Sequence, residues 1–178
     1  DWPPSAISVA LRSANTHEGD NREDWKPSSY RIPLVSHRNS LDATRIRASS
    51  AQVHTLDLGE LVLAGAYVPG REPVLTVLFH GALDRSKASL PIFQRLTGQG
   101  KLGIGHSLIL SDPTLDLSST MRLGWYLGTE RLDLHAAMAR WITEWCAALD
   151  IERVVLQGSS GSSYLRWVEG ESAADEEH

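Results

Sequence analysis

Three short, almost wholly apolar runs mark the middle and the end of the chain. They occupy residues 74–79, 107–110 and 153–156, and each is rich in valine, leucine or isoleucine. A half-exposed strand alternates apolar and polar residues, whereas a strand covered on both faces is apolar throughout. The pattern therefore predicts that residues 74–79, 107–111 and 153–157 are three neighbouring parallel strands, all buried, at the centre of one sheet.

Two segments between these runs have the spacing of helices. Residues 133–149 carry a continuous apolar stripe, and Asp133 is a suitable cap for the first turn. Residues 86–97 fit a shorter helix. Strands that alternate with helices are typical of an α/β fold with right-handed crossovers. We therefore expect a mainly parallel sheet with helices on both faces.

The chain before these runs follows a different pattern. Residues 1–50 are polar and contain prolines without a sustained period, which predicts an extended arm with at most short strands. Trp2 and Trp25 favour packing of this arm along the domain or along another chain, because aromatic side chains usually find a partner. Beyond the arm, two apolar segments flank Gly59-Glu60 and predict a small antiparallel hairpin.

Length, charge and cysteine content indicate which classes of protein this chain can belong to. The 178 residues suffice for one α/β domain at 51–168, followed by an acidic tail at 169–178. The net charge of −5 argues against a nucleic-acid-binding protein. No apolar run reaches the roughly 20 residues that a membrane helix needs, so we expect a soluble protein. The single cysteine, Cys146, is compatible with the cytoplasm but leaves the compartment open.

The third apolar run leads directly into Gly-Ser-Ser-Gly-Ser at residues 158–162. A nucleophile elbow is a tight strand-to-helix turn that needs small residues two positions before and after its serine. Ser160 meets this requirement through Gly158 and Ser162, whereas the neighbouring serines would place a larger side chain there. We predict that Ser160 is a nucleophile at the tip of a strained turn. A glycine-serine loop whose amides bind an anion is the alternative.

His80, Gly81 and Ala82 follow the first apolar run. In esterases a turn of this kind donates a backbone N–H to the oxyanion. Ala82 would supply one such N–H and Gly161 the other. We favour a buried, backbone-bonded His80 over a catalytic base. Asp112 ends the second run, where it would either orient a residue of the site or cap the following turn.

Together these features resemble the α/β-hydrolase family over residues 73–168. More narrowly, the chain is similar to hydrolase-like proteins of unassigned function from actinobacteria and their phages, in residues 79–85 with 90–93, 111–115 and 124–129. The resemblance implies a partial α/β-hydrolase fold with a serine nucleophile and an ester or acyl substrate. No P-loop, dinucleotide fingerprint or metal-ligand cluster is recognisable, so no cofactor and no metal are expected.

The chain departs from the family after the elbow. The acid and the histidine of the family's triad follow the nucleophile, but only eighteen residues follow Ser160, and His178 is a poor candidate for a base. A separate polypeptide could hold the rest of the fold, or a truncated fold could be adapted to binding or assembly. An upstream histidine could also be recruited by an unusual topology. The upstream candidates are His37, His54, His106 and His135.

Two functions are consistent with these residues. The first is a serine-hydrolase-like domain that acts on carboxylic esters or transfers acyl groups, with a base from outside this chain. The alternative is a catalytically silent α/β-hydrolase-like module used for binding or assembly. In either case the unpaired outer edge of the last strand predicts association with a second protein chain or a homo-oligomer.

Overall fold

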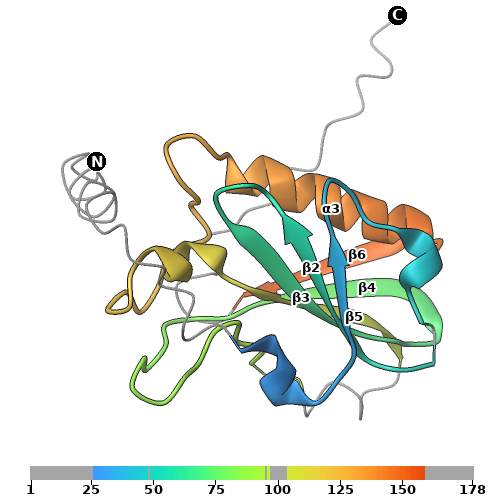
Figure 1. Ribbon diagram of the computed structural model, residues 1–178. Helices are drawn as coiled ribbons and strands as arrows, with labels where there is room; N and C mark the ends of the chain where they lie inside the picture. The colour runs from blue at the N-terminus through green and yellow to red at the C-terminus, as the bar shows by residue number, and fades with distance from the viewer. Residues whose placement is uncertain (1–25, 48, 95, 97–103, 159–178) are drawn as a thin grey trace, which may run out of the picture.

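The computed structural model describes residues 26–47, 49–94, 96 and 104–158. Among these residues, six strands form one mixed sheet in the order β1-β2-β3-β5-β4-β6 (Figure 1). All strands run in one direction except β3, so the prediction of a mainly parallel sheet is confirmed. The strands are β1 (Leu34–His37), β2 (Gln52–Asp57), β3 (Val62–Val68), β4 (Glu72–Phe79), β5 (Gly105–Ser111) and β6 (Arg153–Gly158).

The predicted hairpin is β2 and β3, and it belongs to the main sheet. Gln52 pairs with Tyr67 and Asp57 with Val62 in antiparallel register, which leaves the glycine-containing turn between the strands. Strand β1 pairs in parallel with β2 and comes from the segment expected to be an arm. Two 3₁₀ helices flank it, η2 (Pro27–Tyr30) and η3 (Ala43–Arg45). Part of that segment therefore forms one edge of the sheet.

Strands β5, β4 and β6 are the three neighbouring parallel strands that the apolar runs predict. Phe79 of β4 pairs with Leu110 on one side and with Gly158 on the other. Strand β6, however, lies at the edge of the described sheet, where Val154 and Val155 are 41% and 42% exposed. The prediction of a buried, central strand is wrong for β6, because no described segment fully covers either of its faces.

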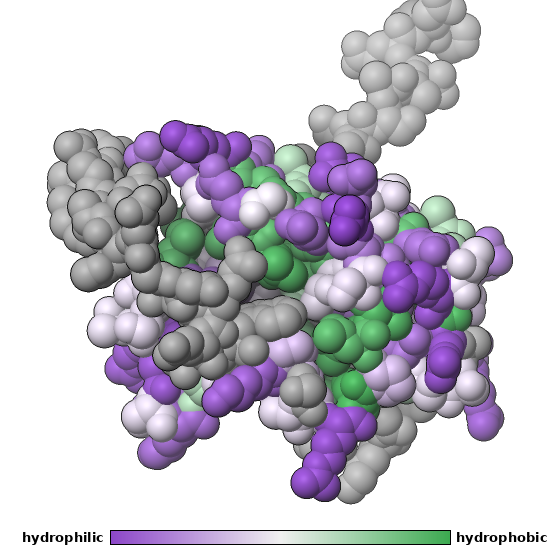
Figure 2. Space-filling view, in the orientation of Figure 1, coloured by the Kyte–Doolittle hydropathy of each residue, from purple (hydrophilic) through white to green (hydrophobic). Residues whose placement is uncertain are grey.

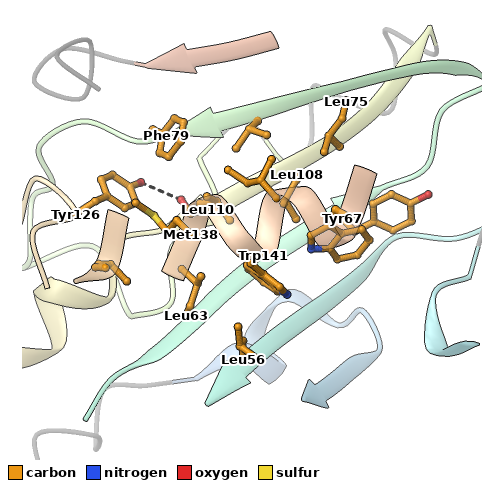
Figure 3. Close-up of a cluster of buried hydrophobic side chains, with 14 residues drawn as sticks. Leu56, Leu63, Tyr67, Leu75, Phe79, Leu108, Leu110, Tyr126, Met138 and Trp141 are labelled. Carbon is orange, nitrogen blue, oxygen red and sulfur yellow. Dashed lines mark hydrogen bonds between the residues drawn. The ribbon is translucent and has the colours of Figure 1, made fainter. Parts of the chain in front are cut away.

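The helix α3 (Leu134–Ala148) covers one face of the sheet (Figure 1). Asp133 caps it as predicted, since its carboxylate accepts a hydrogen bond from the Ala136 N–H at 2.9 Å. Trp141 and Met138 lie against strand residues in the largest buried cluster (Figure 3). No helix among the described residues is long and apolar enough to cross a membrane. The buried helix residues are Leu134, Ala137, Met138, Trp141, Ile142 and Trp145.

The opposite face of the sheet is covered by loops and by η2. Phe93 packs there with Ile109, and its ring centroid lies 4.9 Å from that of Tyr30 in η2. Residues 86–94 are turns and loops, and most of the remaining predicted short helix falls outside the described residues. Helices on both faces are therefore not confirmed, because α3 is the one α-helix bounded within the described part of the chain.

The chain leaves β4 and β5 toward opposite faces of the sheet. After β4 it passes over the face that carries Phe93, and after β5 it leads through η4 (Pro113–Leu117) to α3. Open α/β sheets bind ligands where two neighbouring strands diverge in this way, outside their carboxyl ends. The carboxyl ends of β4, β5 and β6 lie on the same side as η4 in Figure 1. Figure 2 shows the molecular surface from the same side. Most of the coloured residues on this face are hydrophilic, and the hydrophobic residues are gathered in a few limited areas.

Candidate active site

The turn after β4 lies at the carboxyl edge of the sheet. Gly81 is buried and Ala82 is exposed. The Leu83 N–H donates to the Arg122 carbonyl at 2.8 Å, and Arg122 Nε donates to the Leu83 carbonyl at 2.9 Å. These two bonds hold the turn directly after Ala82. No hydrogen bond joins the Ala82 N–H to another of the described residues.

His80 connects the ends of β4 and β5 through both of its ring nitrogens. The Asp112 N–H donates to His80 Nε2 at 3.0 Å, so Nε2 carries no proton. The proton therefore resides on Nδ1, which lies 2.8 Å from the Gly81 carbonyl and donates to it. Burial lowers the pKa of His80, which keeps the ring neutral. His80 therefore supports the turn and has no ring nitrogen left to act as a catalytic base.

Asp112 organises the loop after β5 from a buried position. One carboxylate oxygen accepts the Thr114 N–H at 3.0 Å, which caps η4. The other accepts the N–H groups of Gly124 at 3.0 Å and Tyr126 at 3.1 Å. Burial raises the pKa of Asp112, while these hydrogen bonds act in the opposite direction. Its carboxylate is thus occupied by the backbone of its own loop.

Tyr126 ties this loop to the turn that carries Ala82. Its hydroxyl donates to the Leu110 carbonyl at 3.1 Å (Figure 3) and accepts the His80 N–H at 3.1 Å. Burial raises the pKa of Tyr126 well above its ordinary value, so the hydroxyl keeps its proton. Tyr126 belongs to the stretch at 124–129 on which part of the family resemblance rests. Nothing in that stretch indicated a contact with a residue 46 positions away.

Replacing Tyr126 by phenylalanine is expected to lower the free energy of unfolding by about 2 kcal/mol, because two buried backbone groups lose their partner. Tyr67→Phe is the matched control. Among the described residues, the Tyr67 hydroxyl bonds only to the partly exposed His106, whose Nδ1 also accepts the Gly70 N–H. Chemical denaturation followed by tryptophan fluorescence measures both variants. Equal losses in the two variants would contradict a special role for Tyr126.

The predicted nucleophile Ser160, with Gly161 and Ser162, lies outside the described residues, and so does the predicted strain of its turn. Gly158 is described and ends β6. It pairs with Phe79, so β4 and β6 end side by side. Adjacent strands lie about 4.8 Å apart. The register therefore brings the last residue before the serine turn next to the last residue before the His80 turn.

The other described histidines do not supply a base at this place. His37 Nε2 lies 2.9 Å from His54 Nδ1, and His37 Nδ1 accepts the Asp42 N–H. His106 lies near the amino end of β5, at the opposite edge of the sheet. His135 is exposed on the first turn of α3. No described histidine combines a place at the turn after β4 with a ring nitrogen free to accept a proton.

The described part of the chain also holds no group of three or more histidine, cysteine, aspartate or glutamate residues that could bind a metal ion. The chain matches no protein-family model, no curated protein and no solved structure. At the carboxyl edge of the sheet, β4 and β6 end side by side.

Proposed function

We propose that this chain is a serine-hydrolase-like domain of the α/β-hydrolase type, which cleaves a carboxylic ester or transfers its acyl group. The pairing of Phe79 with Gly158 carries the proposal. An oxyanion is stabilised when two fixed N–H groups reach one oxygen. Ala82, whose N–H is the proposed donor, is three residues beyond Phe79, and Ser160 is two residues beyond Gly158. The register is thus consistent with a nucleophile and an oxyanion donor on neighbouring strands.

In the proposed reaction, Ser160 Oγ attacks the carbonyl carbon of the ester while a base takes its proton. The N–H groups of Ala82 and Gly161 hold the negative oxygen of the tetrahedral intermediate. Collapse of this intermediate expels the alcohol, which regains the proton, and leaves the acyl group on Ser160. Water or a second acyl acceptor then releases the acyl group by the same steps in reverse order.

The base would come with a second protein chain or another copy of this one. This part of the proposal is supported by the exposed edge strand β6, whose Val154 and Val155 are both uncovered on the described sheet. An edge strand with exposed apolar side chains favours association. A chain that pairs with β6 would lie beside the segment that holds Ser160, so assembly and activity would be coupled.

Labelling of the purified protein with a fluorophosphonate tests the proposal. Ser160→Ala is expected to abolish labelling, because the reagent forms a covalent bond only with an activated serine. Ser163→Ala, three residues away in the same segment, is the control and should keep the label. A labelling rate per molecule that rises with protein concentration is expected if association brings the base. Label that persists in Ser160→Ala would contradict the assignment of the nucleophile.

The alternative is a catalytically silent module used for binding or assembly. The observation that favours it is His80, which follows the strand paired with β6 and has both ring nitrogens engaged by backbone groups. A folded, self-associating protein that takes up no fluorophosphonate at any concentration would support this alternative over the enzyme.

A further inference from the structure

The segment Gly-Trp-Tyr-Leu-Gly at residues 124–128 presents two apolar side chains to solvent from a firmly held backbone. Gly124, Tyr126 and Gly128 are buried, whereas Trp125 and Leu127 are 41% and 46% exposed. The backbone N–H groups of all three buried residues are bonded. Those of Gly124 and Tyr126 donate to Asp112, and that of Gly128 donates to Thr114 Oγ1 at 3.0 Å.

Packing and backbone angles show that this arrangement is specific. A Cβ atom at Gly124 would lie 2.5 Å from Thr114 Cβ, so only glycine fits there. Trp125 and Tyr126 adopt φ angles of 59° and 55°, a left-handed conformation that is unfavourable for residues with a Cβ. Such a conformation persists only where the surroundings hold it, and it is common at functional sites. The segment is therefore a rigid platform that directs Trp125 and Leu127 outward.

The platform borders the turn that carries Ala82. The Tyr126 hydroxyl accepts the His80 N–H, and the Arg122 carbonyl accepts the Leu83 N–H. The three residues from Arg122 to Trp125 span at most about 10 Å. A substrate whose carbonyl oxygen binds the Ala82 N–H thus lies within reach of the platform.

We propose that Trp125 and Leu127 bind the apolar acyl chain of the substrate, which makes the substrate an ester of a fatty acid. This inference rests on the proposed function. Transfer of a hydrocarbon chain from water onto an indole and an isobutyl group is favourable in proportion to the apolar area covered. The two arginines beside the turn, Arg85 and Arg122, donate to backbone carbonyls.

Hydrolysis of p-nitrophenyl octanoate, compared with p-nitrophenyl acetate, tests the acyl site. Leu127→Ala and Trp125→Ala are each expected to lower the ratio of kcat/KM for octanoate over acetate by about tenfold, the range in which apolar pockets discriminate. Leu34→Ala is the matched control, because Leu34 is 45% exposed but lies on β1, at the opposite edge of the sheet. The control should keep the ratio. An unchanged ratio in both platform variants would overturn the inference.

Binding of octanoate itself separates this inference from the proposed function. Calorimetric titration is made on the Ser160→Ala background, with and without Leu127→Ala or Leu34→Ala. Weaker octanoate binding caused by Leu127→Ala alone supports the acyl site even if the protein hydrolyses no ester. Hydrolysis without any effect of the platform variants would instead leave the enzyme standing and reject the acyl site. Platform variants that alter only the sedimentation of the protein would also reject it, in favour of a protein–protein contact.

Discussion

Replacing Asp112 by alanine is expected to lower the free energy of unfolding by about 3–5 kcal/mol. The carboxylate is 1% exposed and accepts the backbone N–H groups of Thr114, Gly124 and Tyr126. Each buried donor that loses its partner costs about 1–3 kcal/mol. The substitution would also release the loop that holds Tyr126 against the turn after β4. Urea unfolding followed by tryptophan fluorescence measures the loss.

Asp57→Ala is the matched control for this prediction. Its carboxylate accepts a single backbone N–H, that of Gly59 at 2.8 Å, and the pair is exposed to water. The expected loss is about 1 kcal/mol or less, because water replaces the carboxylate at an exposed donor. Asp112→Asn should fall between the two, since one oxygen remains and the amide nitrogen cannot accept. A loss at Asp112 no larger than at Asp57 would contradict the central role of this carboxylate.

Acidification is expected to destabilise the protein through His54. This side chain on β2 is fully buried, and burial lowers its pKa from 6.5 to about 3. The Asp42 N–H donates to His37 Nδ1, so the proton of His37 is on Nε2 and points to His54 Nδ1. The remaining His54 nitrogen, Nε2, is buried without a hydrogen-bond partner in the described structure. The folded protein therefore holds a neutral ring that resists protonation.

The sign of the effect follows from the two pKa values of His54. In the unfolded chain the imidazole takes up a proton below pH 6.5, whereas the folded chain takes it up only near pH 3. Between these two pH values, each drop of one pH unit therefore lowers the free energy of unfolding by about 1.4 kcal/mol. The stability from His54 is fully present above pH 6.5 and falls by about 3 kcal/mol as the pH approaches about 4.5.

Unfolding free energies measured across this pH range check the prediction with two variants. His54→Asn keeps an acceptor for His37 Nε2 but removes the titrating ring, so stability should depend less steeply on pH than in the natural protein. His135→Asn is the control, because it removes an exposed histidine that lies outside the pair of His37 and His54. Identical slopes in all three proteins would show that His54 is not the responsible group.

The local elements of this fold could be predicted because their causes lie within a few residues. The apolar runs in β4 and β5 need only their own side chains to favour buried strands. The cap of α3 needs only the Asp133 carboxylate and an N–H three residues later. The hairpin of β2 and β3 needs only a glycine-containing turn between two apolar segments. Turn chemistry and side-chain period are short-range properties, so the sequence by itself determined these elements.

The environment of each element was decided by the tertiary structure. The apolar run of β6 resembles those of β4 and β5, but its place at the sheet edge leaves Val154 and Val155 exposed. Strand β1 becomes part of the sheet by pairing in parallel with β2, and this pairing joins two segments that are separate in the sequence. Burial depends on which segments lie across a strand, and the run itself does not contain that information.

In the candidate site, too, some features could be predicted from the sequence and others depended on the tertiary structure. Spacing alone singled out the serine segment at 158–162 and the turn at 80–82, and it marked Asp112 as a possible cap, because each motif is continuous in sequence. The contacts of His80 with Asp112 and with Tyr126 join residues 32 and 46 positions apart. They exist only because β4 and β5 become neighbours and a buried carboxylate shapes the loop between β5 and α3. Hydrogen bonds over such separations follow from strand order and packing, which only the tertiary structure decided.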